Sequence, residues 1–404
     1  MGIHEGQDNS MNDKPGSITR RQLLAASGLA AGVVSAGRAE PPAPARTAPT
    51  APVSIAKCPS YDEDLAGRLE TMFDQIGGIG ALVRGKTVAI KLNLTGGGRF
   101  EGYTAGQTHW VHPKLVGACC AALAKAGARR IRLLESAGRK PDALLEDKLL
   151  SGGWDVTALR SAAPLVEFED TNSLGQGTKY ARLKVLTKPY IYPAFDVNHS
   201  YQDTDVYVSL AKLKNHEECG ITLSIKNSFG ITPNAVYGSR ETVFHYGKIQ
   251  PPNGAPQEIN FTTERYEGWR MPRLLVDITG ARPIDLAIID GIESCVGGEG
   301  PWVPGSKPVR PGVLLVGRNP VCTDAVATAV MGYNPRAGRT EPPFRVFKVE
   351  PDQIVPVQYA DNPMLLAEAV GIGAADLSRI DVRGVSIKEA LYDFEARWKG
   401  QARI

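Results

Sequence analysis

The chain has 404 residues, of which 43% are hydrophobic and 22% are charged, as expected for a globular protein with ample material for a large core. Its formal net charge of +3 is too small to indicate a nucleic-acid-binding protein, because binding nucleic acid calls for a strong positive field. The six cysteines form no CxxC pair and no ferredoxin-type run, which argues against an iron–sulfur cluster and a structural zinc site.

The first 39 residues have the layout of a twin-arginine signal peptide. Arg20 and Arg21 precede a mildly apolar stretch, residues 23–34, and small residues follow at 36–39. Paired arginines in this position are typical of the twin-arginine export route, and the apolar stretch is too short to span a bilayer. We therefore expect the twin-arginine machinery to export the protein, a periplasmic location, and no transmembrane segment in the mature chain.

A linker and one large domain are expected to follow. Residues 40–56 are rich in proline and alanine, which predicts a disordered linker. The α/β domain is then expected to cover residues 57–404. Because this length permits more than one unit, we expect two lobes, 57–200 and 201–404, with the binding site between them.

The first half of the domain predicts a helix and then a strand–helix–strand unit. Residues 61–76 have helical periodicity, and TVAIKLNL at 87–94 has the β-branched content of a buried strand. A helix at 114–128 and a strand at 130–136 come next. This order predicts a right-handed βαβ unit on a mostly parallel, Rossmann-like sheet.

Polar residues follow the first of these strands. Lys91 and Asn93 stand at its end, and His112 stands directly before the next helix. Strand ends and helix starts are where α/β sheets bind ligands. We therefore predict that Lys91 and Asn93 bind substrate and that His112 is catalytic. The glycines at 96–98 could also bring N–H groups to an anion, although they do not match GxGxxG.

The richest stretch is 208–233, where an apolar strand runs into a polar turn and then a short amphipathic segment. It combines three lysines, a histidine and two amides. Strand, turn and helix in this order present basic side chains to an anionic ligand, whereas the alternative is a solvated basic loop. We predict that His216 and Lys226 are catalytic and that Lys214 and Asn227 bind substrate.

The second half continues the α/β pattern after a long loop, 233–270, which is interpreted as a lid because loops of this length are usually functional or mobile. A helix is predicted at 271–280 and another at 321–332. The strands predicted between them cover 285–292 and 312–317.

Acidic residues in this half suggest a divalent cation as a cofactor. Asp290 ends a predicted strand, and Glu299 lies in the glycine-rich loop GGEGPW. Such residues suit a metal ion or the orientation of a substrate hydroxyl; alternatively, Asp290 forms a turn and Glu299 is an exposed acid. We assign Glu299 to substrate binding and Asp290, with His245, to a metal. Asp324 either joins them or favours the dipole of its own helix.

The sequence resembles the family named domain of unknown function 362 over roughly residues 85–380. The resemblance is carried by the segments KLNLTGGG, LAKLKNHEECGITLSIKNSFGITP, DLAIIDGI, GGEGPW and RNPVCTDAVATAVMG. It implies the α/β fold and a site at these segments, but no particular reaction. Some members carry ferredoxin-type cysteines, which this chain lacks, so the resemblance implies no electron transfer here.

The spacing from His216 to Lys226 is also similar to a motif of the nickel-pincer lactate racemase family. This resemblance implies that His216 and His112 (or His109) exchange a substrate proton or hydride. It further implies that Lys226 binds a cofactor or anion and that His245 is a metal ligand. The sequence departs from the motif because it lacks the glycine pair before the lysine and an arginine after the first strand.

Together these residues predict an exported isomerase, epimerase or lyase that acts on a small hydroxylated anion by acid/base chemistry, for which histidine is suited near neutral pH. A periplasmic anion-binding protein without catalysis remains an alternative, as does a metal-dependent hydrolase or transferase using Asp290, Glu299 and Asp324. The absence of GxSxG around any serine argues against an α/β-hydrolase.

Overall fold

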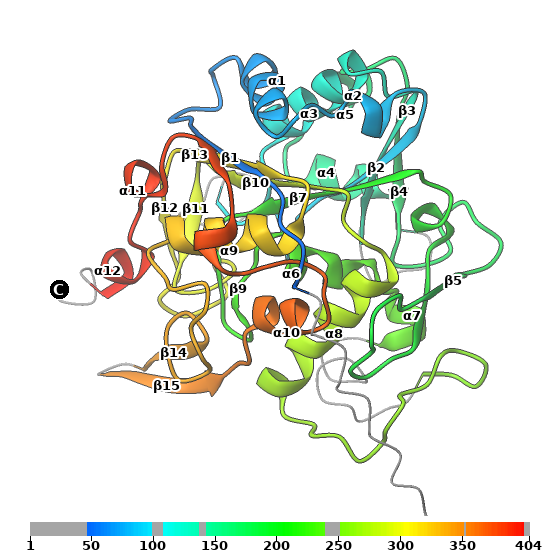
Figure 1. Ribbon diagram of the computed structural model, residues 1–404. Coiled ribbons are helices and arrows are strands. Elements are labelled where there is room, and N and C mark those ends of the chain that lie inside the picture. The colour runs from blue at the N-terminus through cyan, green and yellow to red at the C-terminus, as the bar shows by residue number, and fades with distance from the viewer. Residues whose placement is uncertain (1–46, 99–107, 137–142, 239–250, 351–352, 400–404) are drawn as a thin grey trace, which may run out of the picture. The chain divides into compact units, whose positions relative to one another are not determined.

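The structure is a computed structural model that describes residues 47–98, 108–136, 143–238, 251–350 and 353–399 (Figure 1). These residues belong to one compact unit, Arg46–Ile404. The predicted signal peptide, 1–39, and the predicted metal ligand His245 lie outside the described residues. Within the described ranges, no helix is long and apolar enough to cross a membrane.

One eight-stranded sheet organises the fold, with strand order β16–β1–β13–β10–β7–β2–β3–β4. The strands are β1 (Val53–Lys57), β2 (Thr87–Lys91), β3 (Arg130–Glu135), β4 (Val166–Asp170), β7 (Val206–Lys212), β10 (Leu286–Gly291), β13 (Val313–Gly317) and β16 (Val382–Gly384). All neighbours are parallel except that β13 is antiparallel to both β10 and β1. The predicted α/β fold with a mostly parallel sheet is therefore confirmed.

Helices and small hairpins complete the described structure. The helices are α1 (Leu65–Gln75), α2 (Gly80–Val83), α3 (Pro113–Lys125), α4 (Leu145–Ser151), α5 (Val156–Arg160), α6 (Leu223–Asn227), α7 (Asn234–Tyr237), α8 (Glu267–Ala281), α9 (Pro320–Val330), α10 (Pro363–Ala369), α11 (Ile387–Ala390) and α12 (Phe394–Lys399). The two-stranded pairs are β5 (Ala181–Lys184) with β6 (Ala194–Val197), β8 (Asn215–His216) with β9 (Gly220–Ile221), β11 (Ser294–Val296) with β12 (Lys307–Val309), and β14 (Arg345–Glu350) with β15 (Gln353–Tyr359).

The predicted βαβ unit is β2–α3–β3, and its apolar pattern explains why both faces of the sheet are covered. Val88 and Ile90 of β2 pack in one core cluster with residues of α1 and α3. Ala89, between them, belongs to a second cluster with residues of α8. Successive strand residues point to opposite faces, so an uninterrupted apolar strand needs a helix on each side. Figure 1 shows α1 and α3 on one side of the sheet and α8 and α9 on the other.

The folded chain begins earlier than the sequence predicts. The predicted linker, 40–56, includes most of β1, which pairs antiparallel with β13 and parallel with β16. Local composition does not reveal this strand, because the strand is formed by pairing with partners that lie in the last hundred residues of the chain. The two predicted lobes, 57–200 and 201–404, both contribute strands to the one sheet, since β2 of the first pairs with β7 of the second.

Candidate functional site

A pocket of about 320 Å³ lies at the carboxyl ends of β2 and β3, beside α6. Six residues predicted for the site line it: Lys91, Asn93, His216, Lys226, Asn227 and Glu299. Further polar residues line it, among them Glu135, Lys148 and Glu218, to which the sequence assigned no role. Because strand ends of parallel sheets are the usual place for ligands, this pocket is the candidate functional site.

The last residues of β2 and β3 form a buried ion pair in the wall of this pocket. Lys91 Nζ lies 2.7 Å from Glu135 Oε1 and donates to the Leu92 carbonyl oxygen at 2.7 Å. Burial lowers the pKa of Lys91, and the neighbouring Glu135 opposes this shift. Lys91 therefore adds no net charge to the pocket, because its counter-charge is beside it.

Two other lysines reach the pocket without a carboxylate partner among the described residues. Lys226 of α6 is half-buried, and its Nζ lies 4.7 Å from the centroid of the Phe229 ring. Lys148 of α4 is also half-buried and donates to the Ser136 carbonyl oxygen at 3.3 Å. Burial lowers the pKa of Lys148, as expected for an ammonium with few water contacts. An anion would compensate both charges.

His216 ends β8 as a buried, neutral histidine. Its Nδ1 accepts a hydrogen bond from the Glu218 N–H at 3.1 Å, which places the ring proton of the neutral form on Nε2. Burial lowers the pKa of His216 to about 4. Since the lone pair of the neutral ring is already used, the geometry suits His216 to donating a hydrogen bond toward a ligand, which is narrower than the acid/base role that the sequence predicts.

Two asparagines form a chain of amides at the strand end. Asn93 Nδ2 donates to Asn227 Oδ1 at 3.1 Å. Asn227 Nδ2 lies 3.0 Å from Ser209 Oγ and 3.2 Å from the Lys91 carbonyl oxygen. Both asparagines are buried and line the pocket. This chain of amides holds the start of the loop that follows β2 against α6.

Hydrogen bonds fix the carboxylate of Glu299 in the glycine-rich loop. Its Oε2 accepts from the Glu217 N–H at 3.0 Å, and its Oε1 accepts from Trp302 Nε1 at 3.1 Å. Its Oε2 also lies 3.8 Å from His216 Nδ1. Burial raises the pKa of Glu299, but these neighbours outweigh burial and lower the pKa overall. The carboxylate therefore remains ionised at neutral pH.

Lys214, which the sequence predicts to bind substrate, is not among the residues that line the pocket. The side chain is fully buried, and Nζ donates to the carbonyl oxygens of His109 at 2.7 Å and Glu299 at 3.0 Å. Burial lowers the pKa of Lys214 to about 8. These hydrogen bonds tie the Glu299 loop to the backbone at His109 and leave Lys214 outside the pocket.

Packing explains one of the glycines after β2. Gly96 has φ +69°, and a Cβ added there would lie 2.5 Å from the Trp302 ring. A Cβ at Gly300 would lie 2.3 Å from the same ring. The absence of side chains at these two positions lets the Trp302 ring pack against both loops, which brings Glu299 next to the end of β2.

His112 and Asp290, predicted for catalysis and for a metal, lie in a different, buried cluster. His112 caps α3, because its Nδ1 accepts from the Lys114 N–H, and its ring stacks on Tyr61 at 3.8 Å. Asp290 accepts from Tyr61 at 2.8 Å and from Lys212 Nζ at 2.9 Å. An ammonium thus stands where a metal ion would bind, so this geometry does not support the predicted metal role. His112 does not line the pocket.

The described residues hold no group of three or more His, Cys, Asp or Glu side chains that could bind a metal ion. The six cysteines are buried and unpaired in disulfides. The acidic residues considered for a metal are therefore separated: Glu299 lines the pocket, Asp290 pairs with Lys212, and Asp324 binds the start of α6.

Asp324 of α9 fixes the start of α6, the helix that carries Lys226. Its Oδ1 accepts from both the Ser224 N–H, at 2.9 Å, and the Ser224 hydroxyl, and its Oδ2 accepts from the Ile225 N–H at 2.9 Å. Leu223, directly before them, has φ +50°. Burial raises the pKa of Asp324 to about 7, although these hydrogen bonds oppose the shift. Asp324 serves a neighbouring helix rather than its own dipole.

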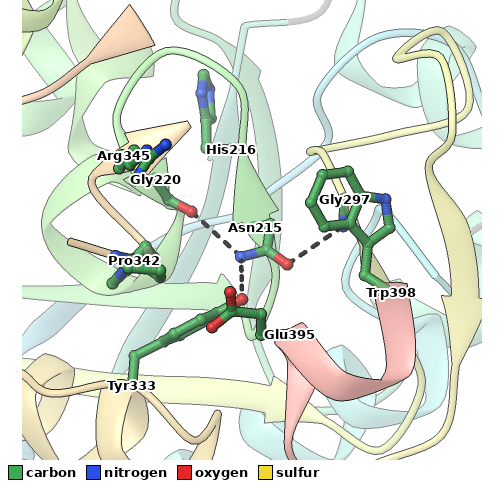
Figure 2. A pocket seen from close by; sticks show the side chains of 10 residues that line it. Asn215, His216, Gly220, Gly297, Tyr333, Pro342, Arg345, Glu395 and Trp398 are labelled. Atoms are coloured by element: carbon green, nitrogen blue, oxygen red, sulfur yellow. Dashed lines mark hydrogen bonds between the residues drawn. The ribbon is translucent and has the colours of Figure 1, made fainter. Parts of the chain in front are cut away.

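A second, much smaller cavity of about 40 Å³ lies on another side of His216. Figure 2 shows the Asn215 side chain there, which accepts from the Gly297 N–H at 3.2 Å and donates to Tyr333 Oη at 3.2 Å. This volume suits about one water molecule. The larger pocket is therefore the better candidate for a ligand.

Comparison with known proteins adds the family to this geometry. The chain is 26% identical over 285 residues to a thylakoid-associated protein of Synechocystis sp., covering 70% of this chain and 75% of that protein. The model of the family described as "Domain of unknown function (DUF362)" matches residues 88–329, which include every residue that lines the pocket. Because the match covers more than half of the 404 residues, this chain belongs to the DUF362 family.

Proposed function

We propose that this protein is an enzyme that binds a small hydroxylated anion in the pocket around Lys226 and removes a proton next to a carboxylate or carbonyl group of that ligand. The main support is that Lys148 and Lys226 reach the pocket without a carboxylate partner among the described residues. A partly buried ammonium is stabilised when an anion binds beside it. This proton-abstraction step is shared by isomerases, epimerases and lyases that react next to a carboxylate or carbonyl group.

The proposal gives the neighbouring groups separate roles. Lys148 and Lys226 neutralise the anionic group of the ligand. His216 donates its Nε2–H to the oxygen on which negative charge develops, as a neutral imidazole can do in a site that excludes water. Glu218, whose buried side chain lines the same pocket, is the proposed base. Lys226 and His216 keep the importance that the sequence predicts, with a changed role for the histidine.

The test is exchange of a carbon-bound hydrogen with solvent. We expect the full-length mature protein in D₂O to replace the hydrogen next to the carboxylate in at least one member of a panel of 2-hydroxy acids and sugar acids, followed by NMR. Lys226→Ala should weaken binding about tenfold to a hundredfold, because it removes a charged partner of the ligand. His216→Phe should slow exchange about 10²-fold or more with little loss of binding, because it removes stabilisation of the developing charge.

Lys184→Ala is the matched control, since Lys184 is exposed and lies on β5, away from the pocket. Exchange that is indifferent to both Lys226→Ala and His216→Phe would refute the proposal. Tight, Lys226-dependent binding without exchange would instead identify an anion-binding protein without catalysis.

We also propose that the protein functions after export through the twin-arginine pathway. The support is the Arg20–Arg21 pair before an apolar stretch and the relative described as thylakoid-associated, a name that places that relative at a membrane system. Changing both arginines to lysine should retain the full-length precursor in the cytoplasm, as measured by cell fractionation and the mass of the chain. Unchanged export and processing of this variant would contradict the proposal.

A further inference from the structure

One polar atom in the pocket wall has no partner among the described residues. Asn93 Oδ1 is buried and makes no hydrogen bond, although the Asn93 side chain lines the pocket and is only 5% exposed. A buried acceptor without a donor is costly. Such an atom in a binding pocket calls for a donor that the ligand brings.

The polarity of this amide is fixed by its neighbour. Asn227 Nδ2 lies within hydrogen-bond distance of the carbonyl oxygens of Lys91 and Leu210 and of Ser209 Oγ. Turning the Asn227 amide over would point its oxygen at two carbonyl oxygens, which repel it. Asn227 therefore presents Oδ1 to Asn93.

The same reasoning then applies to Asn93. Its Nδ2 donates to Asn227 Oδ1 at 3.1 Å, and a reversed amide would set two oxygens against each other. The free atom of Asn93 is consequently Oδ1, which can accept but cannot donate. Thr222 Oγ1 is a second buried, unpartnered atom of the pocket wall, but a hydroxyl rotates and can serve as donor or acceptor, so it imposes no polarity.

We propose that Asn93, oriented by Asn227, is a specificity-determining residue that selects a ligand hydroxyl over a carbonyl at the same position. A hydroxyl donates to Asn93 Oδ1, whereas the oxygen of an oxo group faces it with lone pairs only. Lys148 and Lys226, which line the same pocket without a carboxylate partner among the described residues, disfavour an ammonium as the donor. This inference rests on the proposed function for the anionic part of the ligand and adds the polarity of the group beside it.

The test compares matched acids that differ only at this group. Binding of 2-hydroxybutyrate against 2-oxobutyrate, and of 2-hydroxyglutarate against 2-oxoglutarate, is measured by NMR on the mature protein, with 2-aminobutyrate as the ammonium form. We expect the hydroxy acid of at least one pair to bind tenfold or more tightly than its oxo partner. Asn93→Leu should bring this ratio close to one, mainly by weakening the hydroxy acid.

Exposed Asn260→Ala serves as the control and should keep the wild-type ratio. Equal affinities within each pair in the wild type would overturn the inference even if Asn93→Leu did not fold, and so would a preference for the amino acid or an unchanged ratio in Asn93→Leu. If the acids bind, Lys226→Ala weakens that binding, and the hydroxy and oxo acids bind equally well, only this inference fails. If no probe binds in a way that depends on Lys226, the proposed function fails with it.

Discussion

Lys212→Met is expected to lower the free energy of unfolding by about 3–5 kcal/mol, because it leaves the charge of Asp290 buried without its counter-charge. Lys212 Nζ lies 2.9 Å from Asp290 Oδ2, and both side chains are fully buried. Adding Asp290→Asn to this variant should recover part of the loss, because it removes the unpaired charge. Urea unfolding of the single and double variants measures both effects.

An exposed ion pair provides the comparison. Lys125 Nζ lies 2.6 Å from Glu70, with 71% of the lysine side chain exposed. Lys125→Met should cost much less than Lys212→Met, since water screens such a pair. A loss of similar size in the two lysine variants would show that the buried cluster of Tyr61, Lys212 and Asp290 is not the stabilising centre that its geometry indicates.

Asp324→Ala is expected to destabilise the protein by about 2–4 kcal/mol and to weaken anion binding through Lys226. The substitution leaves the buried N–H groups of Ser224 and Ile225 without an acceptor, and each such loss costs about 1–3 kcal/mol. Asp155→Ala is the control: Asp155 caps the exposed start of α5 through the Ala158 N–H at 2.9 Å, and its loss should cost about 1 kcal/mol. Unfolding and ligand binding are measured on both variants.

The Asp324 carboxyl group also makes the free energy of unfolding fall as pH rises. Because burial raises the pKa of folded Asp324 to about 7 from its usual 3.8, the folded chain holds a proton there at pH values where the unfolded chain has lost it. The stabilising contribution is complete below about pH 4 and disappears as pH rises through 7. Asp324→Asn should therefore lose less stability than the wild type between pH 5 and 8. An identical pH dependence would contradict this assignment. Burial also raises the pKa of Asp277 to about 7, but this residue contributes equally to the wild type and to Asp324→Asn.

Much of the candidate site could be predicted from local pattern. Lys91 and Asn93 follow an apolar strand, and Lys226 and Asn227 lie on the helix after the next polar turn, where α/β sheets bind ligands. The same rule applied to the strand at 130–136 would have found Glu135, which ends β3 and pairs with Lys91.

Other residues of the pocket carry no local signal. Lys148 stands on a short, ordinary amphipathic helix, and nothing in the surrounding sequence distinguishes it from a surface lysine. It contributes to the pocket because α4 packs beside the carboxyl ends of β2 and β3, which brings Lys148 to Ser136. That contact depends on the fold of residues far apart in the chain.

The sequence by itself determined the α/β class, the βαβ unit and the family, because strand and helix periodicities and short motifs are local properties. It could not distinguish polar residues that face a ligand from those that satisfy one another. Lys212 and Lys214 resemble Lys226 in the sequence, but in the structure they are fully buried against partners, Asp290 for the first and two carbonyl oxygens for the second. Only the tertiary structure decided this, since a buried charge is compensated by whichever groups the fold brings to it.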